Sequence, residues 1–240
     1  MSDNEYRVEY HEELDEIRAS VVRLGALTTE MVSRGTDALL SKDLSGAQTL
    51  IDSDDELDEL TVEIEEHVFR LLALQAPMAT DLRFLLCSLK MASQLERSAD
   101  LMVNTCKAAR RLYDVEWDPR IRGLISSMSD EARKLTGRAI DAYVDGDAAL
   151  ANALDDMDSR LDDLHVDYIE AIFTSHQVSS LDLRHAVQLA LIGRYYERIG
   201  DHAVNMGERV SFMVTGWLPE HTGAARIDMR RRRESSEIDD

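Results

Sequence analysis

Four pairs of acidic residues in this sequence are spaced four positions apart, and such pairs could bind a cation. Glu96 and Asp100 form one pair, and Glu197 and Asp201 repeat it with an arginine again following the glutamate. On a helix, residues i and i+4 share a face, where like charges destabilise the helix by about 0.2–0.5 kcal/mol. Water, a cationic side chain or a bound metal ion must offset that repulsion.

These acidic motifs belong to a duplication of about a hundred residues. Each follows an Asp-Leu-Arg, first at residues 81–83 and again 101 residues later at 182–184. Two further acidic pairs correspond at an offset of 104 residues: the pair Asp54 and Asp58 in the first half matches the pair Asp158 and Asp162 in the second. The change of offset predicts a loop before each Asp-Leu-Arg, at residues 75–80 and 175–180. Acids retained in both halves indicate a repeated site.

If the pairs of neighbouring helices face each other, four carboxylates and one amide converge in each half. The amides would come from Asn104 and Asn205, while Lys107 stands where the second half has Glu208. Oxygen ligands from facing helices suit hard or borderline divalent cations such as Mg²⁺, Mn²⁺, Ca²⁺ or Fe²⁺. Acids facing solvent remain an equal alternative, because many other Asp and Glu residues crowd the same helices.

The elements that must position these acids are predicted to be helices. Apolar residues recur at helical spacing nearly throughout, and the 240 residues include only 11 Gly and 3 Pro. Asp43 is a plausible helix N-cap, Thr80 could cap a turn near the start of the third helix, and breaks are expected at 114–119, 145–147 and 175–180. We expect an all-α chain with six long helices. They should form two tandem, pseudo-symmetric three-helix bundles, residues 1–113 and 114–216, before a disordered tail at 217–240.

Several function classes are disfavoured by composition and motifs. A net charge of −20 argues against nucleic-acid binding. The sequence has no apolar run long enough to span a bilayer and begins with an acidic segment unlike a secretory signal, so we expect a cytoplasmic protein. Phosphate-binding loops, Cys-x-x-Cys, Glu-x-x-His and a Ser/His/Asp order are absent, which predicts a non-enzyme.

The cysteines and histidines are weaker candidates for functional residues than the acidic pairs. Cys87 and Cys106 would lie on one helix, too far apart to bond to each other, and are expected to be buried thiols. Three helical histidines share no spacing, so core or surface positions are favoured over metal ligation for His67, His165 and His202. His202 is the exception to watch, because it follows Asp201 directly.

The two copies of Asp-Leu-Arg followed by Glu-Arg-x-x-Asp, in an all-helical chain, resemble the PhoU family over about residues 10 to 216. The resemblance implies two similar three-helix bundles whose acidic motifs bind a divalent metal ion, with Mg, Mn, Fe and Zn as the options. Carried onto this sequence, it implies metal ligands at Glu96, Asp100, Glu197 and Asp201, with Asp54, Asp58, Asp158 and Asp162 opposite. Ser98-Ala99 departs from the usual Ile-Gly of the motif.

The same resemblance implies a function. PhoU-like proteins are cytosolic negative regulators of high-affinity phosphate uptake and of phosphate-starvation signalling. The implied partners are the ATPase subunit of a phosphate transporter and a sensor histidine kinase, through which the protein would reach the membrane; a homodimer is also expected. Two alternatives stay open: a metalloenzyme or metal-storage bundle, and a PhoU-like regulator of a different transporter. The basic run Arg230 to Arg233 is not explained by the resemblance.

Overall fold

The computed structural model describes residues 3–179 and 181–217, which contain seven helices and no strand. The predicted all-α architecture is therefore confirmed for this part of the chain. In chain order the helices are α1 (Asp3–Ser41), α2 (Leu44–Asp52), α3 (Asp54–Gln75), α4 (Ala79–Arg111), α5 (Pro119–Asp145), α6 (Ala148–Ser179) and α7 (Leu183–Thr215). None of the described helices is long and apolar enough to cross a membrane.

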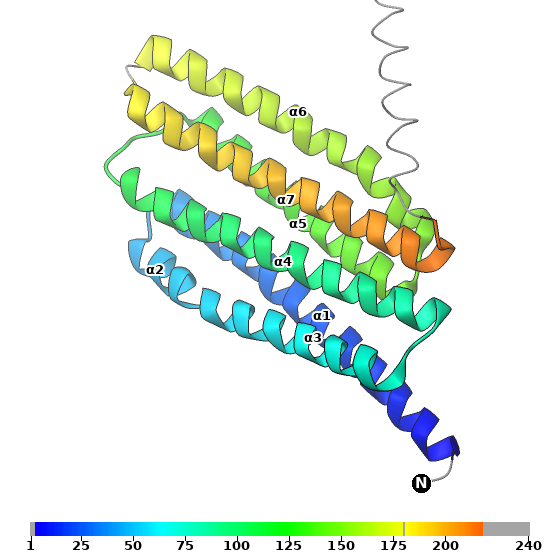
Figure 1. The fold of residues 1–240 in the computed structure, drawn as a ribbon. Coiled ribbons are helices and arrows are strands. Elements are labelled where there is room, and N and C mark those ends of the chain that lie inside the picture. The colour runs from blue at the N-terminus through cyan, green and yellow to red at the C-terminus, as the bar shows by residue number, and fades with distance from the viewer. Residues whose placement is uncertain (1–2, 180, 218–240) are drawn as a thin grey trace, which may run out of the picture.

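The helices form two bundles that pack against each other (Figure 1). The first bundle contains α1 to α4, and the second contains α5, α6 and α7. Helix α4 packs against α7 and α1 packs against α5, so one apolar core runs through both bundles. Helix α3 and helix α6 lie at opposite outer edges of the molecule (Figure 1). The predicted pair of tandem three-helix bundles is confirmed, with α2 and α3 together as one of the three helices in the first.

The helix predicted from Asp43 onward is interrupted at Ser53, which separates α2 from α3. Asp43 does cap α2, since its carboxylate accepts a hydrogen bond from the Gly46 backbone N–H at 2.9 Å. The interruption makes Asp54 the first residue of α3, where a carboxylate is favoured by the positive end of the helix dipole. The acidic pair of the first bundle thus opens a helix rather than lying inside one.

The loops agree with prediction in the first half and differ in the second. Residues 76–78 connect α3 to α4, within the predicted loop at 75–80. Helix α4 begins at Ala79, and the residue before it makes no side-chain cap, so Thr80 lies inside the first turn instead of capping it. The loop predicted at 175–180 was wrong for residues 175–179, which continue α6 because no Gly or Pro interrupts them. Of the predicted tail, only Trp217 falls within the described residues.

Close packing of α6 on α7 depends on glycines in α7. A Cβ at Gly207 would lie 2.6 Å from the backbone oxygen of Ala151 in α6. We therefore expect Gly207→Ala to lower the free energy of unfolding by about 1–3 kcal/mol, measured by urea denaturation. Gly123 in α5 is the matched control, because a Cβ at that position would meet nothing within 4 Å. Gly123→Ala should raise stability by about 0.5–1 kcal/mol, and equal stability of the two variants would contradict this packing.

Candidate metal centre

The predicted acidic pairs of the first bundle lie near each other across the contact between α3 and α4. Burial raises the pKa of Asp54 to about 6, and repulsion from Asp58 and Asp100 adds to this shift. Burial also raises the pKa of Glu96, again with contributions from Asp100, Asp58 and Asp54. Four of the eight predicted ligands are therefore close enough to repel one another, and we call them the first acidic cluster.

The equivalent residues of the second bundle form a second acidic cluster between α6 and α7. Burial raises the pKa of Asp158 to about 7, with repulsion from Asp162, Asp201 and Glu197. Burial followed by the charge of Asp201 also raises the pKa of Asp162 and that of Glu197. The structure therefore brings the predicted acids together in both halves, on the helix pairs that the duplication indicated.

The second cluster is packed more tightly than the first, because a glycine lies beneath it. Asp158 is only 9% exposed, and a Cβ at Gly200 would collide with its Oδ1 atom. In the first bundle the corresponding residue is Ala99, which carries that Cβ, and Asp54 is partly exposed. The Ser-Ala variant of the motif therefore lacks the glycine against which Asp158 packs in the second half.

Cationic side chains neutralise these clusters only in part. In the second cluster Arg194 pairs with Glu197 through Oε1. Two buried oxygens there, Glu197 Oε2 and Asp158 Oδ1, have no hydrogen-bond partner among the described residues. In the first cluster the charge of Lys107 lowers the pKa of Asp54 and opposes the effect of burial. Buried carboxylate oxygens without partners are costly, and a bound cation would supply the missing interaction.

No three Asp, Glu, His or Cys side chains in the described part of the chain stand close enough to hold one metal ion. The acids of each cluster therefore lie near one another, but their side chains do not converge on one point as the ligands of a bound ion would. Asp58, Asp100 and Asp162 are exposed, so their side chains have room to rotate toward a cation. The donors are carboxylates, the ligand type that hard divalent cations prefer, and the residues present fit such an ion.

Sequence reasoning missed one residue beside the second cluster, Arg194, and set another, His165, aside as a core or surface histidine. Arg194 lies three positions before Glu197, a spacing that places both on one helix face. His165 lies three positions after Asp162 and near it, and its Nε2 is buried without a hydrogen-bond partner among the described residues. Burial and the charge of Arg194 lower the pKa of His165, while the charge of Asp162 opposes this shift. Helical spacing alone could have identified both.

His202 takes no part in the acidic cluster. It is 3% exposed, and its Nδ1 lies 3.0 Å from the Ser98 hydroxyl of α4. Burial, with the charges of Arg97 and Arg198, lowers the pKa of His202 to about 4. The sequence marked His202 as the exception to watch because it follows Asp201, but the structure places it in the core between α4 and α7, where the Ser98 hydroxyl is its partner.

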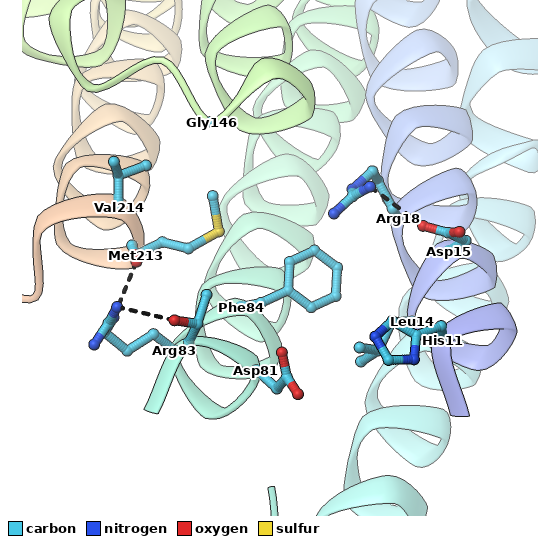
Figure 2. A pocket seen from close by; sticks show the side chains of 11 residues that line it. His11, Leu14, Asp15, Arg18, Asp81, Arg83, Phe84, Gly146, Met213 and Val214 are labelled. Atoms are coloured by element: carbon cyan, nitrogen blue, oxygen red, sulfur yellow. Dashed lines mark hydrogen bonds and ion pairs between the residues drawn. The ribbon is translucent and has the colours of Figure 1, made fainter. Parts of the chain in front are cut away.

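The two Asp-Leu-Arg motifs are used differently. Arg83 Nε donates a 3.0 Å hydrogen bond to the Met213 carbonyl in the last turn of α7, and so ties the bundles together (Figure 2). Asp182 instead caps α7 by accepting a hydrogen bond from the Arg184 backbone N–H. Arg83 borders a cavity of about 520 Å³, in which Arg18 pairs with Asp15 at 3.2 Å (Figure 2). Most charged side chains of this cavity already have a partner, since Asp81 accepts a hydrogen bond from the Tyr10 hydroxyl at 3.3 Å, although the buried Arg18 Nε has none among the described residues.

The pKa shifts predict how pH affects the metal-free protein. Above about pH 4 the folded chain holds protons that the unfolded chain has released, on Asp54 up to its pKa of about 6 and on Asp158 up to its pKa of about 7. Their contribution to stability is therefore present below about pH 4 and is lost as pH rises through the folded pKa values.

Asp158→Asn mimics the protonated side chain and does not titrate. In chelator, the variant should melt at a higher temperature than the wild type near about pH 7.5 and at a similar temperature near about pH 5. Paired thermal melts at the two pH values measure this. A difference between the proteins that does not change with pH would show that Asp158 titrates normally.

Comparison with known proteins gives concordant matches. A family model described as the PhoU domain matches residues 21–109 and again residues 125–210. A Mycobacterium tuberculosis protein named phosphate-specific transport system accessory protein PhoU homolog 1 is 33% identical over 214 residues, covering 89% of this chain and 96% of the relative. A Caulobacter vibrioides PhoU homolog is 33% identical over 210 residues, covering 86% of this chain and 90% of the relative.

Solved structures show the same fold. The crystal structure of PhoU from Pseudomonas aeruginosa aligns with a TM-score of 0.81 at 27% identity, covering 87% of this chain and all of that chain. The phosphate transport system regulatory protein PhoU from Streptococcus pneumoniae aligns with a TM-score of 0.79 at 26% identity, over 87% of this chain and 98% of that chain. The similarity therefore extends through both bundles.

Proposed function

This chain belongs to the PhoU family, and we propose that it is an accessory protein of phosphate transport that represses phosphate uptake and phosphate-starvation signalling when phosphate is plentiful. The observation that carries the proposal is the family match in both halves, together with relatives of nearly equal length named as accessory proteins of phosphate transport. The function would be regulatory rather than catalytic.

We propose that the protein acts in the cytoplasm, as a homodimer, on two partners: the ATPase subunit of a phosphate transporter and a sensor histidine kinase. The relatives' names support association with a phosphate transport system. The acidic surface, with a net charge of −20, favours partners with basic contact surfaces. The protein would reach the membrane only through these partners.

We propose further that both acidic clusters bind a divalent cation, chosen among Mg²⁺, Mn²⁺, Fe²⁺ and Zn²⁺. The ligands would come from Asp54, Asp58, Glu96 and Asp100 in the first bundle, and from Asp158, Asp162, Glu197 and Asp201 in the second. Support comes from the mutual repulsion of the carboxylates and from the unpartnered oxygens of Asp158 and Glu197. A cation in either acidic cluster would hold together the two helices that supply its ligands.

Deletion of the gene tests the regulatory role. In phosphate-rich medium the deletion strain should express phosphate-uptake genes that the wild type represses, and it should accumulate excess phosphate. Reporter expression and cellular phosphate content measure the two effects, and the wild-type gene supplied on a plasmid should reverse both. An unchanged phosphate response with a catalytically inert protein would assign the chain to a different transporter. An unchanged response with a catalytically active protein would favour a metalloenzyme.

A further inference from the structure

Large apolar side chains are exposed at equivalent positions in the two bundles. We define the first apolar patch as Val62, Phe69, Leu82 and Leu86, and the second as Val166, Phe173, Leu183 and Val187; all eight are exposed. Every member of one patch corresponds to a member of the other at the duplication offsets of 104 residues in α3 and α6 and 101 in α4 and α7. Core packing explains why buried apolar residues recur, but it does not explain recurrence at the surface.

The first apolar patch borders a groove between α3, α4 and α7. Phe69 and Leu86 line a cavity of about 540 Å³ there, together with Leu89, Phe212 and the buried Cys87. Asp54, Asp58, Val62 and Phe69 follow one another on α3 at helical spacing, so they lie on one face of that helix. The apolar patch therefore continues the line of the first acidic cluster toward the loop at 76–78.

The second apolar patch has the equivalent place in the second bundle. Phe173 lies near the end of α6, and Val187 lies in the first turns of α7, which runs antiparallel to α6 (Figure 1). Phe173 is 64% exposed and Phe69 is 56% exposed, so neither aromatic ring is covered by its own bundle. The two patches thus occupy corresponding positions in the two repeats.

Acidic residues flank both patches, and they also recur. Glu59, Glu63 and Glu66 are exposed on α3, and Asp163, Asp167 and Glu170 are exposed at the corresponding positions of α6. Lys90 and Arg209 line the opposite wall of the first groove, toward α7. The first patch therefore borders an apolar groove with Glu65 and the acidic edge on the α3 side and two cations on the other, and the second patch repeats the apolar residues and the acidic edge. A helix with an apolar face and a basic edge turned toward α3 or α6 has complementary chemistry.

We propose that each apolar patch binds a cationic amphipathic helix of a protein partner, and that the two patches bind two copies of that helix in a twofold-symmetric partner. Exposed aromatic and aliphatic residues at helical spacing are typical of helix-in-groove recognition. A second copy of this chain is a poorer occupant, since it would bring one acidic edge against another. Naming the transporter ATPase as the natural partner rests on the proposed function. The kind of helix that the patches would bind is inferred from their side chains alone.

The first test uses the full chain and a labelled amphipathic peptide of about 18 residues, with Leu and Phe on one face and Lys and Arg on the other. A peptide of equal composition but without helical periodicity is the control. Fluorescence anisotropy should show two bound amphipathic peptides per chain. Phe69→Ala with Leu86→Ala should weaken one site roughly tenfold to thirtyfold, and Phe173→Ala with Val187→Ala should weaken the other equally. Val144→Ala, which removes an exposed apolar side chain outside both patches, should change nothing.

Three results would overturn the proposal. One is peptide binding that the patch substitutions do not change or that the non-periodic peptide reproduces. Another is a change of oligomeric state in the patch variants without loss of peptide binding, which would assign the patches to a second copy of this chain. The third is peptide binding only after removal of residues 218–240, which would make the chain's own C-terminal segment the occupant.

A second measurement separates this proposal from the proposed function. The purified ATPase subunit of the phosphate transporter should bind the wild-type chain and lose most of its affinity for the variant with all four substitutions. Equal binding of both chains would overturn the patches as the docking surface and leave the regulatory role intact. If the ATPase binds neither chain while the peptide results hold, the groove is supported and the proposed function fails.

Discussion

Divalent cations are expected to raise the melting temperature of the chelator-treated protein by roughly 5–10 °C for each occupied bundle. A ligand that binds only the folded state at a hundred times its dissociation constant stabilises it by about 2.7 kcal/mol. Here the cation also relieves repulsion among carboxylates, including those that surround Asp158. Melts with Mn²⁺, Mg²⁺ or Fe²⁺ added back after chelation measure the effect.

A monovalent salt at matched ionic strength is the control for this first prediction. It screens the exposed carboxylates but cannot bridge several of them, so it should raise the melting temperature far less. If none of the divalent cations raises the melting temperature beyond this control, the acids are solvated and the metal proposal is wrong.

Substitutions confined to one bundle are expected to remove the metal response of that bundle alone. Glu197→Gln with Asp201→Asn should abolish the part of the metal-induced rise in melting temperature that the second acidic cluster contributes. Glu96→Gln with Asp100→Asn should abolish the part that the first cluster contributes. The reason is that each cluster draws its carboxylates from one bundle, and the charges that shift the pKa of Asp54 or of Asp158 come from that residue's own bundle. Combining all four changes should leave almost no response.

The readout for these variants is the metal-induced shift relative to each variant's own metal-free melt. This matters because Glu197→Gln also removes the ion pair with Arg194. Asp156→Asn with Glu170→Gln removes two exposed charges from α6 outside the cluster, and it should keep the full shift. A shift that falls equally in this control and in the cluster variants would indicate a general effect of net charge.

Much of the fold could be predicted from spacing along the chain. Apolar periodicity indicated the helices, and the break at Asp145-Gly146-Asp147 became the connection between α5 and α6, with Gly146 at a positive φ of 60°. The interruption at Ser53 could not be predicted, because serine is compatible with a continuous helix. The continuation of α6 through Ser179 was missed for a related reason, since polar residues without Gly or Pro permit either a helix or a loop.

The grouping of the acids could be anticipated in part, because the acidic pairs recur in both halves on neighbouring predicted helices. What surrounds the acids could not be anticipated. The contact of Asp158 with Gly200 and the pairing of Ser98 with His202 depend on which side chains meet across helix interfaces. The same holds for the exposure of Phe69 and Phe173, because large apolar side chains usually lie in the core. Spacing along one helix does not contain this information.

Metal content decides whether the two repeated acidic clusters each bind a divalent cation. The measurement is elemental analysis after equilibrium dialysis of metal-depleted protein against Mn²⁺, for the wild type, the two cluster variants and their combination. We expect bound metal in the wild type, less in each cluster variant and none above background in the combination. Equal metal content in all four proteins, or none in the wild type, would show that the clusters are not metal sites.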